Sequence, residues 1–201
     1  FMLSGCEICH RKREFNLTIE PYQEGAMILG KRNKTVQVLI LAVIVILGGI
    51  AISNAYSKPT YPEVGSRIPD LSLHALNGDT VQLSDYKGKF LILNFWGSWC
   101  EPCEREMPTL QKAADDWKDR NVEVVGINYG EDAIVVDNYM KAVKVHFTML
   151  LDTKKNVTKA FGVRPLPTTF FIKPDGKVHA IHTGEVTTSQ LETNLEQMAK
   201  E

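Results

Sequence analysis

The feature that most restricts the fold of this chain is an unbroken apolar segment near its N-terminus. From Val36 to Ile52 the only polar side chain is Gln37, and none is charged. Widened to residues 35–56, a helix rising about 1.5 Å per residue would measure roughly 33 Å, enough for a hydrocarbon core of about 30 Å. A buried core helix normally carries a polar stripe, which this segment lacks. Residues 35–56 are therefore predicted to be a single transmembrane anchor surrounded by membrane lipid.

The basic residues around this segment predict its orientation. Lys31, Arg32 and Lys34 come directly before it, whereas only Lys58 lies close behind it. Basic residues concentrate on the cytoplasmic side of a membrane segment. Residues 1–34 are therefore expected in the cytoplasm, and everything after the anchor on the outer side of the cell membrane.

A cleaved signal peptide is the alternative to an anchor. Residues 53–55 (Ser-Asn-Ala) resemble a small-residue cleavage site, but the apolar segment is longer than the usual 7–15 residues of a signal peptide. An N-terminus at Tyr56 on the mature protein would establish cleavage. Residues 57–66, which contain two prolines and a glycine, are expected to be a linker to a folded domain over residues 67–201.

Strand and helix patterns alternate in this domain. Residues 90–96 are almost continuously apolar, as in a central strand buried on both faces, and Asn77-Gly78 predicts the turn of a β-hairpin. Strands are expected at residues 71–76, 80–83, 90–96, 122–129, 147–151, 168–172 and 178–183, and helices at 101–119, 132–143, 153–161 and 188–200. This order predicts an α/β domain with a mixed central sheet flanked by helices.

Charge and cysteine content narrow the classes of function. The formal net charge is −1, so no basic excess points to nucleic acid as a partner. The four cysteines form two Cys-x-x-Cys pairs, Cys6/Cys9 and Cys100/Cys103, whereas disulfide-stabilised secreted domains scatter their cysteines along the chain. Such close pairs favour redox chemistry or metal binding.

Cys100 and Cys103 stand where the predicted central strand gives way to a helix. Unpaired N–H groups and the helix dipole stabilise an anion at a helix start, and Cys-x-x-Cys thiols there can have a pKa near 7 instead of about 8.5. Cys100 is thus the expected attacking thiolate and Cys103 the resolving thiol, with Pro102 stiffening the first turn. A zinc site would need two more ligands, which neither a later cysteine nor suitably spaced histidines supply. No metal is expected.

The residues around this pair resemble a known family. The run Phe95–Cys103 (Phe-Trp-Gly-Ser-Trp-Cys-Glu-Pro-Cys) is similar to the active-site signature of the thioredoxin superfamily. With Glu-Pro between the cysteines and Glu-Met-Pro after them, residues 94–108 resemble its ResA/TlpA branch, and the likeness covers about residues 67–200. It implies a thioredoxin fold with an N-terminal β-hairpin and a helix-containing insertion at 131–147. It also implies that the dithiol works without a separate cofactor.

Further site residues follow from the resemblance. Leu166-Pro167-Thr168 is similar to the superfamily loop in which a cis-proline faces the dithiol and leaves backbone exposed for an extended substrate. An ordinary trans-proline before a strand is the alternative. Glu101, Pro102 and Trp99 are the other residues expected to support the active site. Trp99 and Trp96 are expected to frame the site and pack around it.

Two glutamates are candidates for proton chemistry. Thioredoxin itself carries a buried aspartate where this chain has Asn94. The resemblance therefore implies that Glu106, on the same helix face as Cys103, supplies the acid/base function; a solvated helix glutamate is the alternative. Glu131 matches a second glutamate near the family's site, although a carboxylate at a helix start needs no functional reason.

The implied function is reduction of the disulfide in apocytochrome c Cys-x-x-Cys-His motifs before haem attachment, with electrons from a CcdA-type membrane carrier. A general extracytoplasmic reductase or an oxidase of the same fold is the alternative, and the reduction potential distinguishes them. A peroxiredoxin-like peroxidase is a third alternative, but Leu93 and Gly97 replace the proline and threonine of its Pro-x-x-x-Thr-x-x-Cys pattern. A non-catalytic apocytochrome or haem chaperone is the fourth.

The first cysteine pair has an interpretation of its own. Cys6, Cys9 and His10 spell the Cys-x-x-Cys-His pattern of covalent haem attachment. The expected cytoplasmic location argues against haem, which is attached on the outer side. Because Met27 begins a segment typical of an anchored family member, residues 1–26 are interpreted as an upstream extension without an assigned function.

Overall fold

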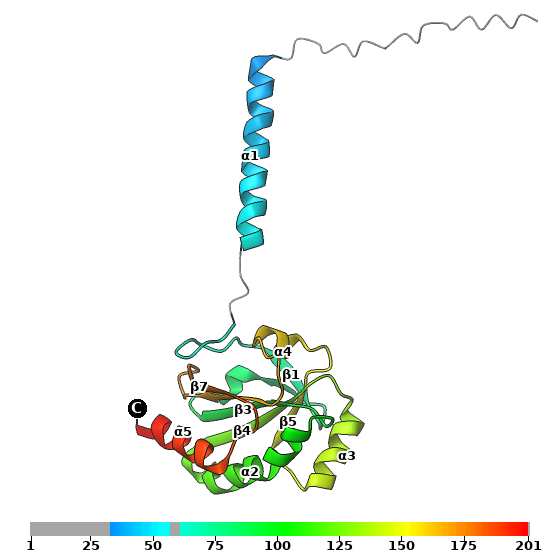
Figure 1. Cartoon of the computed structure of the whole chain (residues 1–201), viewed down its shortest axis with the longest axis vertical. Coiled ribbons are helices and arrows are strands. Elements are labelled where there is room, and N and C mark those ends of the chain that lie inside the picture. Colours follow the sequence, from blue (N-terminus) through cyan, green and yellow to red (C-terminus); the bar gives the residue numbers. More distant parts are fainter. Residues whose placement is uncertain (1–32, 57–60, 201) are drawn as a thin grey trace, which may run out of the picture. The chain divides into compact units, whose positions relative to one another are not determined.

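The computed structural model describes residues 33–56 and 61–200, in two compact units, Phe1–Lys58 and Pro59–Glu201. In the first unit, helix α1 runs from Lys34 to Tyr56 (Figure 1). Its segment Lys34–Ile52 is long and apolar enough to cross a membrane, and none of it is buried within protein. This helix is consistent with the predicted anchor. The Cys-x-x-Cys-His motif near the N-terminus lies outside the described residues.

The second unit is built on one mixed sheet in the order β2-β1-β5-β4-β3-β6-β7. β3 pairs in parallel with β4, and β4 with β5, whereas the remaining neighbours are antiparallel. The strands are β1 Ser72–Ala75, β2 Thr80–Gln82, β3 Phe90–Trp96, β4 Val122–Asn128, β5 Thr148–Leu151, β6 Thr168–Ile172 and β7 Val178–Thr183. The predicted mixed sheet is confirmed.

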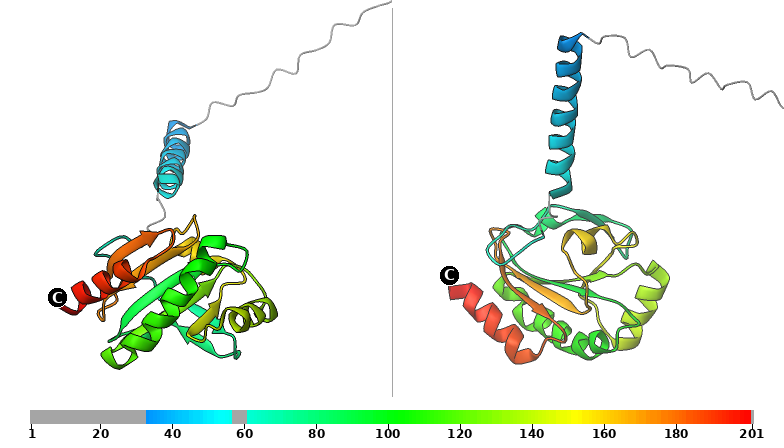
Figure 2. Two further views of the ribbon diagram at one scale, coloured as in Figure 1. Left: turned by 60° about the horizontal axis from the view of Figure 1, so that its bottom comes forward. Right: turned by 45° about the horizontal axis from the view of Figure 1, so that its top comes forward.

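Helices cover both faces of this sheet (Figures 1 and 2). Side chains of α2, α3 and α5 pack in one hydrophobic cluster, and those of the short α4 pack in a second cluster on the other face. The helices are α2 Glu101–Trp117, α3 Ala133–Val143, α4 Asn156–Ala160 and α5 Thr188–Lys200.

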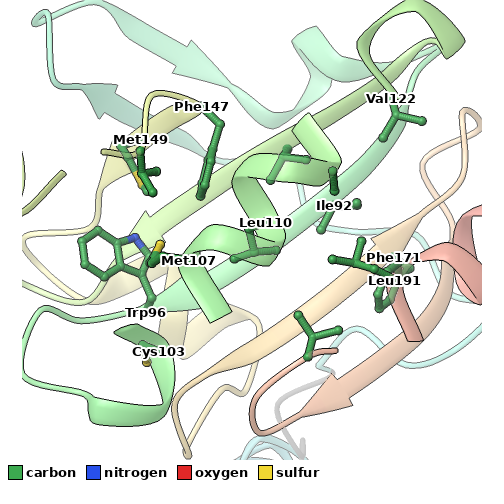
Figure 3. Close-up of a cluster of buried hydrophobic side chains, with 14 of the residues drawn as sticks. Ile92, Trp96, Cys103, Met107, Leu110, Val122, Phe147, Met149, Phe171 and Leu191 are labelled. Carbon is green, nitrogen blue, oxygen red and sulfur yellow. The ribbon is translucent and has the colours of Figure 1, made fainter. Parts of the chain in front are cut away.

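The central strand β3 contributes to both clusters, because successive side chains of a strand point to opposite faces. Ile92 and Trp96 pack in the first cluster, and Leu93 and Phe95 in the second. Cys103 lies beside Trp96 at one end of the first cluster (Figure 3). The strand predicted to be buried on both faces is therefore the one that leads directly to the dithiol.

Several predicted boundaries differ from the structure for local reasons. Leu83 begins a 3₁₀ turn, Leu83–Tyr86, instead of ending strand β2. Asn121 and Lys155 have φ angles of 59° and 58°, and a left-handed residue cannot continue a right-handed helix. Asn121 therefore ends the turn that follows α2, and Lys155 delays the start of α4 to Asn156.

The predicted hairpin is present, but its position in the sheet was not predicted. β1 pairs with β2 across the Asn77-Gly78 turn, and also with β5. The hairpin therefore extends the central sheet at the edge next to β5.

Candidate active site

The two cysteines lie at the N-terminus of α2, just beyond the end of β3. Cys100 is the N-cap residue, with extended backbone, and Cys103 lies in the first turn. A disulfide joins them, with their Cα atoms 5.2 Å apart. Cys100 is 6% exposed and Cys103 is fully buried. Pro102 occupies the first turn, where a missing N–H costs no helical hydrogen bond. Of the two cysteines, Cys100 is therefore the one that retains contact with solvent.

The proline loop lies at the same end of the sheet. The Leu166–Pro167 peptide bond is cis, and Leu166 is half-buried while Pro167 is buried. Phe95 of β3 is the register partner of Thr168 in the antiparallel β6. Pro167 is therefore level with the end of β3 that leads to the dithiol. Thr168 closes the loop, because its Oγ1 donates to the carbonyl of Pro165 at 2.9 Å.

Glu106 is completely buried, one turn after the equally buried Cys103. Asn94 Nδ2 donates to Glu106 Oε1 at 2.7 Å, and the backbone N–H of Val186 donates to Oε2 at 2.9 Å. The same amide nitrogen of Asn94 also donates to Thr169 Oγ1 at 3.0 Å. The alternative of a solvated helix glutamate is therefore wrong.

The environment of Glu106 raises the pKa of its carboxyl group into the neutral range. Burial raises the pKa of Glu106 to about 7, and the negative charge of Glu185 acts in the same direction. The hydrogen bonds from Val186 and Asn94 oppose this rise, because they stabilise the ionised carboxylate. A carboxyl group with a pKa near the working pH can both accept and return a proton.

Glu131 stands just before α3 and bonds to the loop that carries the dithiol. Its carboxylate accepts from the backbone N–H of Ser98 at 2.8 Å, from Ser98 Oγ at 2.5 Å and from Asn128 Nδ2 at 2.7 Å. Burial favours a higher pKa for Glu131, but these hydrogen bonds together outweigh it and leave the pKa below its ordinary value. Glu131 therefore remains ionised and braces the segment that precedes Cys100.

The two tryptophans occupy different environments. Trp96 is fully buried, whereas Trp99 is 65% exposed. Its ring and that of Tyr129 meet in a T-shaped arrangement, with centroids 6.2 Å apart. Glu101 is exposed between the cysteines and forms an ion pair with Arg105. Trp99 and Glu101 therefore present surface beside the dithiol.

Comparisons with known proteins decide the family. The sequence profile described as the AhpC/TSA family matches residues 64–181. Thiol-disulfide oxidoreductase ResA of Bacillus subtilis (strain 168) is 43% identical over 163 residues, covering 80% of this chain and 90% of that protein. ResA of Geobacillus thermodenitrificans (strain NG80-2) is 38% identical over 159 residues, covering 79% and 91%. The chain belongs to the ResA family of thiol–disulfide oxidoreductases.

Solved structures confirm the thioredoxin fold of this ResA family member. StoA from Bacillus subtilis aligns with a TM-score of 0.56 and 28% identity, covering 63% of this chain and 96% of that one. A thiol:disulfide interchange protein of the thioredoxin family from Chlorobium tepidum TLS aligns with a TM-score of 0.61 and 25% identity, covering 68% and 97%. The predicted enzyme class, a thiol–disulfide oxidoreductase, is likewise confirmed.

Some contacts in the ResA site were not predicted. Asn94 was interpreted as the loss of thioredoxin's acid, yet its amide donates to the carboxylate of Glu106. The strand alternation could have placed Asn94 on the α2 face with Ile92 and Trp96. No sequence signal pointed to Val186, or to Lys155, whose ammonium lies 4.4 Å from the centre of the Tyr129 ring.

The buried carboxyl of this ResA protein predicts a pH-dependent stability. Glu106 has a pKa of about 7 in the folded state against an ordinary value of 4.5. The folded protein therefore keeps a proton over this interval that the unfolded chain releases. We expect the free energy of unfolding to fall by about 3 kcal/mol as pH rises through it. Denaturant titrations of the oxidised protein between pH 4 and pH 8 measure this loss, which the Glu106→Gln variant should lack.

Proposed function

We propose that this protein is a membrane-anchored disulfide reductase that acts on the outer side of the membrane. In the reduced enzyme, the Cys100 thiolate attacks a substrate disulfide, forms a mixed disulfide and releases one substrate thiolate. Cys103 then attacks the Cys100 sulfur, which releases the second substrate thiol and leaves the Cys100–Cys103 disulfide. Two electrons pass to the substrate, and no separate cofactor is required.

The observation that carries this proposal is the combination of a slightly exposed Cys100, a fully buried Cys103 and a buried carboxyl. Cys100 is the N-cap of α2, where the helix start stabilises a thiolate. Glu106 has a pKa of about 7, which suits it to take the proton of Cys103 as that thiol attacks. The reverse transfer would occur when the active-site disulfide is reduced again.

The surrounding residues are proposed to dock and orient the substrate. The cis bond before Pro167 would hold the preceding backbone, at Leu166, open to an extended substrate segment. Thr168 would close this loop, and the exposed Trp99 would contact the substrate. Glu131 would hold the loop before Cys100 through Ser98. Glu101 and Pro102 would shape the rim of the site between the cysteines.

We propose apocytochrome c as the substrate, specifically the disulfide of its Cys-x-x-Cys-His motif before haem attachment. The support is membership of the ResA family, together with the resemblance to the ResA/TlpA branch. Residues 35–56 would anchor the domain of residues 67–201 through the linker at 57–66, with residues 1–34 in the cytoplasm. Electrons would come from a CcdA-type membrane carrier, because cytoplasmic reductants cannot reach the site.

The test compares two substrates of the reduced protein. We expect an oxidised Cys-x-x-Cys-His peptide to be reduced much faster than an unrelated exported protein with one accessible disulfide. Equal rates would instead support the second candidate, a general extracytoplasmic reductase. A reduction potential near that of the strongest oxidants, about −120 mV, would contradict the reductase direction altogether.

A further inference from the structure

The loop of residues 184–186 contacts three parts of the site at once. The backbone N–H of Gly184 donates to the carbonyl of the cis-proline Pro167 at 2.9 Å. Arg105 Nε of α2 donates to a carboxylate oxygen of Glu185 at 2.7 Å. The backbone N–H of Val186 donates to the buried carboxylate of Glu106. One short loop therefore joins the proline loop, the dithiol helix and the candidate acid–base group.

The contact between Glu185 and Arg105 holds this loop against α2. Arg105 lies one residue before Glu106 and also pairs with Glu101, between the cysteines, at 2.8 Å. His182 of β7 adds a further contact, with its Nε2 atom 3.1 Å from the backbone oxygen of Glu185. Because both partners of the Arg105–Glu185 pair are partly exposed, the pair contributes little to global stability. Its effect is local, on where the loop places the N–H of Val186.

We propose that Glu185 is a positioning residue that acts through Glu106, by pairing with Arg105 so that the backbone N–H of Val186 stays bonded to the carboxylate. This inference rests on the proposed role of Glu106 in proton transfer. It gives Glu185 two opposite effects on the same carboxyl. Its own charge disfavours ionised Glu106, whereas the bond that it maintains favours the ionised form.

The groups that face Glu106 come from several elements. Asn94 of β3 donates to Glu106, and the same amide group also donates to the hydroxyl of Thr169 on β6. Cys103 shares the helix face of Glu106. The 184–186 loop supplies the negative charge of Glu185. The carboxylate of Glu185 forms an ion pair with Arg105, and its backbone oxygen contacts the ring of His182 on β7. In the oxidised protein both cysteines are held in the disulfide and do not titrate, so the influence of Glu185 can be measured there alone.

The experiment separates the two effects with a matched pair of variants in the oxidised full-length chain in detergent micelles. Glu185→Gln removes the charge but keeps an oxygen that accepts from Arg105, whereas Glu185→Ala removes both. The Glu106 carboxyl carbon is followed by ¹³C NMR over pH, and assigned by its absence in Glu106→Gln. Glu192→Gln, which removes an exposed carboxylate from α5, is the control and should titrate like the parent protein.

Positioning predicts that Glu106 becomes a stronger acid in Glu185→Gln than in the parent protein. In Glu185→Ala its acid dissociation constant should be roughly two- to fivefold smaller than in Glu185→Gln, about the factor that one hydrogen bond to Arg105 can supply. The chemical shift of the Val186 amide proton should change with the titration of Glu106 in Glu185→Gln. In Glu185→Ala this change should be much smaller. Arg105→Ala, which keeps the charge of Glu185, should weaken the same amide response.

Identical titrations in Glu185→Ala and Glu185→Gln, with an unchanged Val186 response, would show that Glu185 acts by charge alone and would overturn the proposal. Because the protein is oxidised and not turning over, this result is independent of the proposed function. The proposed role of Glu106 in catalysis has a separate test: it fails if the Glu106→Gln variant reduces substrates as fast as the parent protein.

Discussion

Replacing Cys103 by alanine is expected to abolish turnover and to leave substrates covalently attached to Cys100. Cys100 keeps 6% of its surface exposed whereas Cys103 keeps none, so Cys100 is the cysteine that a substrate can reach first, and the first attack should survive the change. Without the neighbouring thiol, the mixed disulfide can be resolved only by an external thiol. Intramolecular reactions have effective concentrations far above those of thiols in solution, so resolution should slow by about a thousandfold or more.

The measurement is capture of the adducts from cells that express the Cys103→Ala protein, followed by non-reducing electrophoresis and mass spectrometry. Recovery of apocytochromes would support the proposed substrate, and recovery of assorted exported proteins would support the general reductase. The matched control is Cys100→Ala, which should yield no adducts. Adducts of equal abundance on Cys103 in that control would contradict the assignment of Cys100 as the attacking thiol.

The second large effect is expected from Glu106→Gln. The side chain keeps its size, but its single amide oxygen can accept from only one of the two donors, Asn94 Nδ2 and the Val186 N–H, that bond the carboxylate. The change also removes the proposed proton acceptor for Cys103. General acid–base catalysis typically contributes a factor of 10² to 10⁴, so we expect the resolution step to slow by about a hundredfold.

Stopped-flow measurements between pH 5.5 and 8.5 separate this step from the first attack. In the parent protein, resolution should accelerate as pH rises through the titration of the Glu106–Cys103 pair, whose apparent pKa values belong to both groups. The Gln variant should lose the component near pH 7. Glu104→Gln, an exposed change on the same helix, is the control. A loss of equal size in Glu104→Gln would show that charge on α2, and not proton transfer, sets the rate.

The sequence alone predicts those parts of the protein that depend on local pattern. The apolar stretch predicts α1, and the continuous apolar run predicts β3 with its observed bounds, Phe90–Trp96. The position of Cys100 between that strand and α2 followed from the same pattern. The cis-proline at Pro167 and the choice of Glu106 as a candidate followed from resemblance to a known family, and the structure shows the cis bond and the burial of Glu106.

Only the tertiary structure decides the contacts between segments that are distant in the chain. The hairpin joins the sheet beside β5, and of the two tryptophans near the dithiol Trp96 is fully buried whereas Trp99 is 65% exposed. Glu106 and Val186 are 80 positions apart, yet they share a hydrogen bond in the interior. The order of the strands and the packing of α2 against the sheet bring such groups together, and no local pattern encodes that geometry.

The cysteine pair shows both contributions. Its spacing and its place before a helix are properties of the sequence, and they suffice to predict a redox dithiol. The 6% exposure of Cys100 against the complete burial of Cys103 is a property of the fold. The pKa of about 7 for Glu106, one turn after Cys103, likewise depends on burial and on donors from β3 and the 184–186 loop. The sequence therefore determined that this chain carries a redox dithiol. The tertiary structure decides which groups are available to exchange protons with it, because burial excludes water and leaves only the groups that the fold brings together.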